Sequence, residues 1–147
     1  MKFLPNENLF KRRFSSNQKC LRYILSVRLV AGFKCPKCGG VKFRWITGRF
    51  AVRCTQCKYR RQLSILKETV MEHTHKPLRY WFWSAYMFAK FGRYTTADFQ
   101  RDFGYVRPDT ITRILSPLRE RLSSLGEKEW EADRGKGDTI HRLLGLL

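Results

Sequence analysis

Two stretches of the sequence decide the fold: Cys35-Pro36-Lys37-Cys38-Gly39-Gly40 and Cys54-Thr55-Gln56-Cys57. Each contains a C-x-x-C pair, and a 15-residue spacer separates the two pairs. Pairs at this separation are typical of a four-cysteine zinc site, because each pair forms a tight turn that aims both sulfur atoms at one point. The spacing therefore predicts one Zn²⁺ bound by Cys35, Cys38, Cys54 and Cys57. Four protein ligands leave no open position, so this zinc would be structural and not catalytic.

The residues between the two pairs have the pattern of a β-hairpin. Residues 41–46 alternate apolar and basic side chains, Thr47-Gly48-Arg49 is a turn sequence, and residues 50–53 return as a second strand. A domain over residues 33–66 is too small to bury an apolar core of its own, so we expect zinc to take the place of one. The sequence therefore predicts a zinc ribbon, a hairpin with one cysteine pair at either end.

A basic arm and a short helix are expected before the ribbon, over residues 1–32. Residues 1–14 form the arm, which is most basic at Lys11-Arg12-Arg13. Hydroxyl residues that suit an N-cap, followed by apolar residues at helical spacing, then predict a helix that ends at Gly32. Cys20 falls within this helix and outside both pairs, and we expect a buried thiol that packs as a small apolar side chain.

Three helices are predicted over residues 77–125. The first spans residues 78–91, the second runs to Phe103 and the third opens at Pro108-Asp109. Three helices with a short turn before the last have the layout of a helix-turn-helix domain, with a generic three-helix packing domain as the alternative. The expected fold class is therefore α+β, a small Cys₄ zinc ribbon followed by a three-helix helix-turn-helix domain.

Two details of these helices follow from single residues. Thr95 or Thr96 suits the N-cap of the second helix, because its hydroxyl can accept a hydrogen bond from a free amide of the first turn. Pro117 falls about two turns into the third helix, where the missing amide and the bulky ring should kink or end it.

The segments on either side of the helices carry fewer signals. Residues 67–76 are expected to be a connector, in which His73 and His75 are interpreted as polar linker residues. Residues 126–147 are too short for a domain, and we expect a poorly ordered remnant tail there.

The charge distribution points to an anionic partner. The chain has 147 residues, with 30 Lys or Arg against 12 Asp or Glu, a formal net charge of +18. Between Asn8 and Lys67 there are 16 basic residues and no acid, interleaved with aromatic residues and cysteines. A surface that only confers solubility mixes both signs, so this stretch favours nucleic-acid contact.

The candidate DNA contacts divide into two sets. Phosphate contacts are expected from the acid-free stretch, through Lys11, Arg12, Arg13, Lys42, Arg44, Arg49, Arg60 and Arg61. The start of the third helix and the turn before it are expected to face the bases, through Arg107, Thr110, Thr112 and Arg113, with Arg113 the best candidate for a bidentate contact to guanine.

Several runs carry a family resemblance: Phe33-Lys34-Cys35-Pro36-Lys37-Cys38-Gly39, Arg53-Cys54-Thr55-Gln56-Cys57, Leu63-Ser64, Thr74-His75-Lys76-Pro77-Leu78-Arg79-Tyr80-Trp81-Phe82 and Asp98-Phe99-Gln100-Arg101-Asp102-Phe103-Gly104. In this order they resemble the N-terminal half of insertion-sequence transposases of the ISXO-like group, over roughly residues 14–122. That family joins a short helix, a zinc ribbon and a helix-turn-helix to a DDE nuclease domain. The resemblance implies that these modules bind transposon ends.

The catalytic half of that family is not matched. Glu129-Trp130-Glu131-Ala132-Asp133 is similar to the strand that precedes the family's first catalytic Asp, but the match stops at Arg134. A DDE nuclease needs on the order of a hundred further residues and several converging carboxylates. We therefore expect a truncated relative that binds DNA selectively, depends on zinc and is not an enzyme.

Two alternatives remain. The same modules could serve as a stand-alone regulator of transcription or transposition, or the chain could be a basic, zinc-stabilised structural subunit of a nucleoprotein complex that binds RNA. The expected partner is double-stranded DNA with transposon-end-like sites, with a homodimer left open and with neither a membrane nor a small-molecule substrate. The expected location is the cytoplasm, on the nucleoid.

Overall fold

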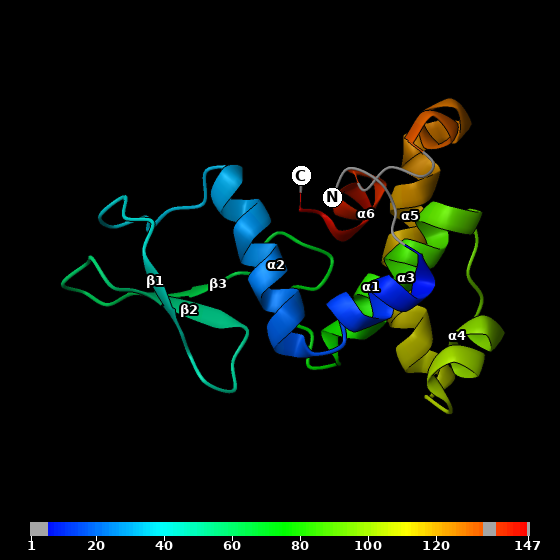
Figure 1. Cartoon of the computed structure of the whole chain (residues 1–147), viewed down its shortest axis with the longest axis horizontal. Helices are drawn as coiled ribbons and strands as arrows, with labels where there is room; N and C mark the ends of the chain where they lie inside the picture. Colours follow the sequence, from blue (N-terminus) through cyan, green and yellow to red (C-terminus); the bar gives the residue numbers. More distant parts are fainter. Residues whose placement is uncertain (1–5, 134–137, 147) are drawn as a thin grey trace.

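The computed structural model describes residues 6–133 and 138–146, and the side-chain surroundings of residues 6–126 and 139–146. A small antiparallel sheet lies at one end of the molecule and a helical body at the other, with helix α2 (Asn17–Val30) between them (Figure 1). The expected mixture of helices and a small antiparallel sheet is confirmed. Within the described part of the chain, no helix combines the length and the apolar character needed to cross a bilayer.

The sheet has three short strands in the order β1 (Phe43–Trp45), β2 (Ala51–Cys54) and β3 (Gln62–Ser64). The predicted hairpin between the cysteine pairs is confirmed as β1 and β2, which pair antiparallel. The first strand is shorter than expected, because the backbone of residues 41 and 42 bonds to residues 55 and 56. The third strand was not predicted, and it extends the hairpin through antiparallel pairing with β2.

Helix α3 (Leu78–Phe91) forms the centre of the helical body and has the predicted bounds. Ten of its 14 residues are buried, so it is surrounded on nearly all sides. The neighbouring helices α2, α5 and α6 contact it directly. Helix α4 (Thr96–Phe103) is also as predicted, with Thr95 as its N-cap. The order of three helices is therefore as expected, with a turn over residues 104–107 before the last.

Helix α5 (Pro108–Asp133) continues through Pro117, so the prediction that it could end at that residue is wrong. A proline in a helix removes the amide that would bond the carbonyl four residues earlier, here that of Arg113. Arg113 and Pro117 line the same surface hollow, where water can replace the lost donor. The helical geometry breaks instead at Gly126, whose φ is 74°. The acidic segment 129–133 lies on the helical continuation and is not a strand, and the surroundings of the Asp133 side chain lie outside the described residues.

The expected basic arm is instead a docked helix, α1 (Glu7–Arg13). The side chain of Asn6 caps it by accepting a hydrogen bond from Leu9 N at 2.8 Å. Phe10 and Phe14 are buried among the aromatic rings of α3, and the ring centroids of Phe10 and Tyr86 are 4.4 Å apart. This burial outweighs the repulsion among the cations of the last turn.

The expected poorly ordered tail is wrong for helix α6 (Asp138–Leu144), which packs against α3 and α5. Ile140, Leu143 and Leu144 are completely buried in the same core. The Tyr23 hydroxyl and His141 Nε2 form a hydrogen bond that joins α6 to α2. Residues 134–137 and 147 of that tail lie outside the described residues.

Candidate metal centre and nucleic-acid surface

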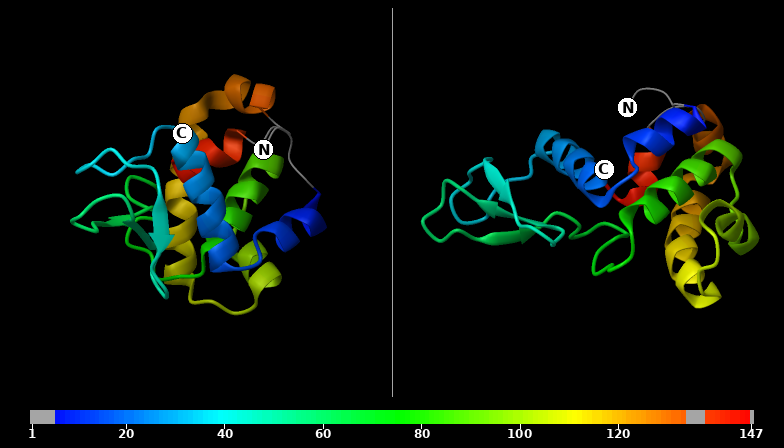
Figure 2. Two further views of the ribbon diagram at one scale, coloured as in Figure 1. Left: turned by 60° about the vertical axis from the view of Figure 1, so that its left-hand side comes forward. Right: turned by 60° about the horizontal axis from the view of Figure 1, so that its bottom comes forward.

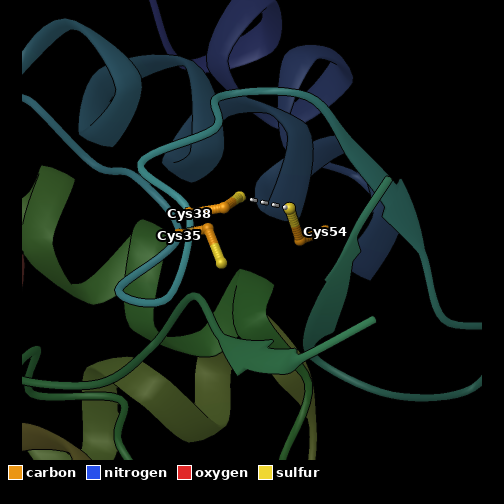
Figure 3. A group of neighbouring side chains, drawn as sticks. All are labelled: Cys35, Cys38 and Cys54. Carbon is orange, nitrogen blue, oxygen red and sulfur yellow. Dashed lines mark hydrogen bonds between the residues drawn. The ribbon is translucent and has the colours of Figure 1, made fainter. Parts of the chain in front are cut away.

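Three of the four predicted ligands converge at one point in the ribbon. Cys35 and Cys38 lie in the loop before β1, and Cys54 ends β2 and faces them (Figure 3). The three sulfur atoms all lie within 4.8 Å of one another, and those of Cys38 and Cys54 are 3.6 Å apart. Among the described residues, this is the only group of three or more His, Cys, Asp or Glu side chains close enough to bind one metal ion.

Two glycines let the first cysteine pair close into its turn. Gly39 has a φ of 71°, in the left-handed region, and its amide donates to the carbonyl of Cys35 at 2.8 Å. The amide of Gly40 points at the Cys38 sulfur, 3.4 Å away. A Cβ at Gly40 would lie 2.5 Å from Oε1 of Gln56, so the second pair packs directly against this glycine.

Gln56, which the sequence did not single out, joins the two turns. Its Oε1 accepts from the amide of Val41 at 3.0 Å, and the amide of Thr55 donates to the carbonyl of Lys42 at 3.1 Å. The fourth predicted ligand, Cys57, is buried and packs with Cys35 and Cys54. Its sulfur is not part of the group of three.

Hydrogen bonding gives the thiols of the first pair different pKa values. The backbone amide of Cys38 stabilises the Cys35 thiolate and lowers the pKa of Cys35 to about 7. The amide of Gly40 lowers the pKa of Cys38, but burial and the neighbouring Cys54 and Cys35 thiols raise it to about 11. Several thiolates held this close repel one another, so a cation among them would favour the ionised cluster.

The geometry of this group suits a tetrahedral zinc ion. With Zn–S bonds of about 2.3 Å, ligand sulfurs in a tetrahedral site lie about 3.8 Å apart. The 3.6 Å separation of the Cys38 and Cys54 sulfurs is close to that value. Thiolates are soft donors of the kind that structural zinc sites use. The arrangement of these three cysteines is therefore compatible with zinc binding.

The predicted DNA contacts lie on the surface but are spread over several elements. Every one of them is exposed except Thr110, which is half-buried. The cations of α1 lie on the helical body, away from the sheet (Figure 1). Two of them stand over aromatic rings, Lys11 over Trp83 at 4.8 Å and Arg13 over Tyr23 at 5.5 Å. The structure thus does not gather the predicted cations in one patch.

The sheet also exposes Arg53, which is not among the DNA contacts predicted from the sequence. Arg44 on β1 and Arg53 on β2 are paired directly opposite each other, and both are exposed. Gln62 on β3 continues the same row. Like charges in this position destabilise a sheet. The alternation of residues along each strand predicts which side chains share a face, but the pairing of Arg44 with Arg53 also requires the register of the two strands.

The structure confirms the prediction that the Cys20 thiol is buried. Its side chain is completely buried in α2, and burial raises its pKa to about 12. It takes no part in the sulfur group of the ribbon.

Residues 15–60 match a family model described as the transposase zinc-ribbon domain. The matched segment contains α2, both cysteine pairs and the hairpin of β1 and β2. It ends before α3, so the resemblance to transposases is confirmed for the zinc ribbon alone. The curated proteins and the solved structures gave no significant match.

Proposed function

We propose that this chain is a zinc-stabilised protein that binds double-stranded DNA in the manner of the end-binding region of a transposase. The observation that carries the proposal is the convergence of Cys35, Cys38 and Cys54 inside the segment that matches a transposase zinc ribbon. The formal charge of +18 supports an anionic partner.

One zinc ion would be held by Cys35, Cys38 and Cys54 together with Cys57. Cys57 already packs against the other two buried cysteines, and a rotation of its side chain would supply the fourth sulfur. The metal would cross-link two turns that have little apolar surface to bury. Lys34, Lys37, Arg53 and Lys58 flank the ligands and would offset the net charge of about −2 on a four-thiolate zinc site.

The face of the sheet would contact the phosphate backbone. Arg44 and Arg53 repel each other across the strands in the free protein, and a phosphate between them would relieve that repulsion. Arg49 in the hairpin turn and Arg60 and Arg61 before β3 are further exposed cations of the ribbon that could contact phosphates.

Helices α3, α4 and α5 would act as the helix-turn-helix, with α5 in the major groove. The eight-residue α4, the turn over residues 104–107 and the start of α5 have the lengths that this motif uses. Thr112 and Arg113 are exposed on the first turns of α5, next to the half-buried Thr110. Arg113 is the side chain that would read guanine through two hydrogen bonds.

The chain would bind DNA without cutting it. Metal-dependent strand transfer needs several converging carboxylates. Mixed with Mg²⁺ or Mn²⁺ and duplex DNA, the protein should therefore neither nick nor join strands. Cleavage that co-purifies with the protein and disappears in an Asp133→Asn variant would contradict this part of the proposal.

A salt titration on preferred and random duplexes tests the division of roles. Arg44→Ala should weaken binding to both duplexes alike and make the slope of log affinity against log salt shallower by about one unit. It should also stabilise the ribbon slightly, because it removes the repulsion from Arg53. Arg113→Ala should cost about 1–3 kcal/mol on the preferred duplex and little on random DNA.

The preferred duplex would first be selected from a random pool with the zinc-loaded protein. Equal losses on both duplexes for Arg113→Ala would make α5 a packing element and leave specificity to the ribbon. Preferential binding to structured RNA over any duplex DNA would contradict the proposal and favour a structural role in a nucleoprotein complex.

A further inference from the structure

The connector over residues 67–76 separates two surface hollows that lie between the ribbon and α5. One hollow, of about 570 Å³, lies between the connector and the hairpin turn, where Arg49 and Lys67 line it. The other, of about 340 Å³, lies between the connector and the start of α5, where Thr110 and Arg113 line it. Residues 72–75 line both hollows, so the connector is the ridge between them.

The connector, which the sequence predicted without indicating what holds it, is anchored in the core at several points. Met71 is completely buried, and the buried Thr69 hydroxyl donates to the carbonyl of Leu66 at 2.6 Å. Farther along, Thr74 Oγ1 accepts from the indole nitrogen of Trp81 on α3 at 3.2 Å. These contacts hold the side chains between the anchors in place beside α5.

Three exposed side chains on this ridge are of types that can donate hydrogen bonds to phosphate. His73, His75 and Lys76 are exposed, and the His73 side chain retains 90% of its accessible surface. His73 also has a φ of 65°, a conformation that a residue with a Cβ adopts only at a cost. Backbone conformations of this kind concentrate at binding sites, where they aim a side chain.

The charges around the two hollows are almost all positive. Lys67 and Arg49 on one side and Lys76 and Arg113 on the other surround the two histidines. The acid that lines both hollows is Glu72, whose carboxylate contacts other groups of the loop. One oxygen accepts from the amide of Glu68 at 3.1 Å, and the other lies 3.6 Å from Nε2 of His73. The second exposed acid of the connector, Glu68, lines neither hollow and interacts electrostatically with Arg28.

We propose that the connector is a third DNA-contacting element, which binds the phosphates of one strand between the ribbon and α5. This inference rests on the proposed function, because it names part of the path of the same duplex. The hairpin turn, the connector and the start of α5 lie along one edge of the molecule, the lower edge in Figure 1, and stay on one side in the right-hand view of Figure 2. A duplex that contacts Arg49 through a phosphate and Arg113 through a base edge would pass over the ridge between the two hollows, which carries His73 and His75, with Lys76 in the second hollow.

The test is a salt titration of Lys76→Gln against a matched control, Arg22→Gln, on one selected duplex. Arg22 is an exposed cation on α2 that lines neither hollow, and its substitution changes the net charge by the same amount. Lys76→Gln should make the salt slope shallower by about 0.9, the contribution of one phosphate contact, whereas Arg22→Gln should leave the slope unchanged. The double variant His73→Gln/His75→Gln should weaken binding to specific and random duplexes alike.

The outcomes separate this inference from the proposed function. If Lys76→Gln and the double histidine variant bind as the wild type does, while Arg49→Gln and Arg113→Gln bind more weakly, the connector is not a contact and the proposed function stands. Equal effects of Lys76→Gln and Arg22→Gln would mean that only the total charge matters, which also overturns the inference. Failure of the zinc-loaded wild type to bind any duplex would overturn both. Unchanged zinc content and helix signal in each variant exclude misfolding as the cause.

Discussion

The ribbon and the helical body are stabilised in different ways. The cysteine end of the ribbon has a small cluster of Cys35, Cys54 and Cys57 with Phe43 packed against it, on strands of three or four residues. The helical body instead buries a continuous group of aromatic and aliphatic side chains around α3. The comparison leads us to expect that the cysteine end needs a metal to hold its shape, whereas the helical body is held by burial of apolar surface.

The largest effect should come from a ligand. Cys54→Ser should abolish zinc binding and unfold the ribbon, because apparent zinc-binding free energies are about 10–16 kcal/mol in small zinc domains. The helical body should keep its circular-dichroism signal. Elemental analysis and amide hydrogen exchange would measure the two effects separately.

The matched control for that experiment is Cys20→Ser, which changes a buried cysteine outside the sulfur group. It should leave the zinc content unchanged. Freshly purified native protein without zinc, or protected ribbon amides in Cys54→Ser, would contradict a metal-dependent ribbon.

A smaller but still large effect should come from the core of the helical body. Leu143 on α6 is completely buried, so Leu143→Ala should lower the free energy of unfolding by about 2–5 kcal/mol. Zinc content should not change. Chemical denaturation followed by circular dichroism measures the loss, with Glu120→Ala, an exposed substitution on α5, as control. Equal stability of the two variants would mean that α6 does not belong to the core.

The smallest of these effects should come from Asp102, a half-buried carboxylate that joins α4 to α3. Asp102 Oδ2 accepts from the Trp83 indole nitrogen at 2.9 Å and from the Tyr94 hydroxyl at 2.7 Å. Burial raises the pKa of Asp102, but these two hydrogen bonds and Arg101 outweigh it, so the pKa is lowered overall. Asp102→Asn should therefore cost about 1–3 kcal/mol at neutral pH.

The sign of the pH dependence follows from the lowered pKa. A carboxyl whose pKa is lower in the folded than in the unfolded state stabilises the fold above its unfolded pKa of about 3.9, and this contribution disappears as the pH falls through the folded value. The difference in stability between wild type and Asp102→Asn should be complete at pH 7 and should narrow below about pH 4. Urea unfolding at several pH values measures it, and a difference that grows with acid would refute the assignment.

The features that could be predicted correctly from the sequence are those that depend on residues close together in the chain. The spacing of the cysteines was sufficient to predict that Cys35, Cys38 and Cys54 lie close together. The N-cap of α4 was predictable because Thr95 and Asp98 bond to each other's backbone amides within one turn, at 3.2 and 3.1 Å. Neither feature depends on a residue far away in the chain.

The features that sequence reasoning missed depend on distant partners. Helix α1 is held because Phe10 packs on Tyr86, and α6 because its leucines enter the core beside α3 and α5. The connector is likewise held from outside, since the amide of Val70 donates to the carbonyl of Leu144 at 3.2 Å. A basic run or a short apolar run does not reveal by itself which surface will bury it.

Arg28 has a consequence for how the two regions would act on one ligand. From α2, its Nη1 donates to the carbonyls of Ile65 at 3.0 Å and Lys67 at 2.6 Å, where the chain leaves β3 for the connector. This guanidinium braces the ribbon against a helix that is itself packed on α3. If the proposed function holds, binding of one region to DNA would present the other at a high effective concentration and at a set distance along the duplex. The avidity of the whole chain for DNA, and the spacing between the contacts made by the ribbon and by the helical body, would then depend on a side chain that need not touch DNA.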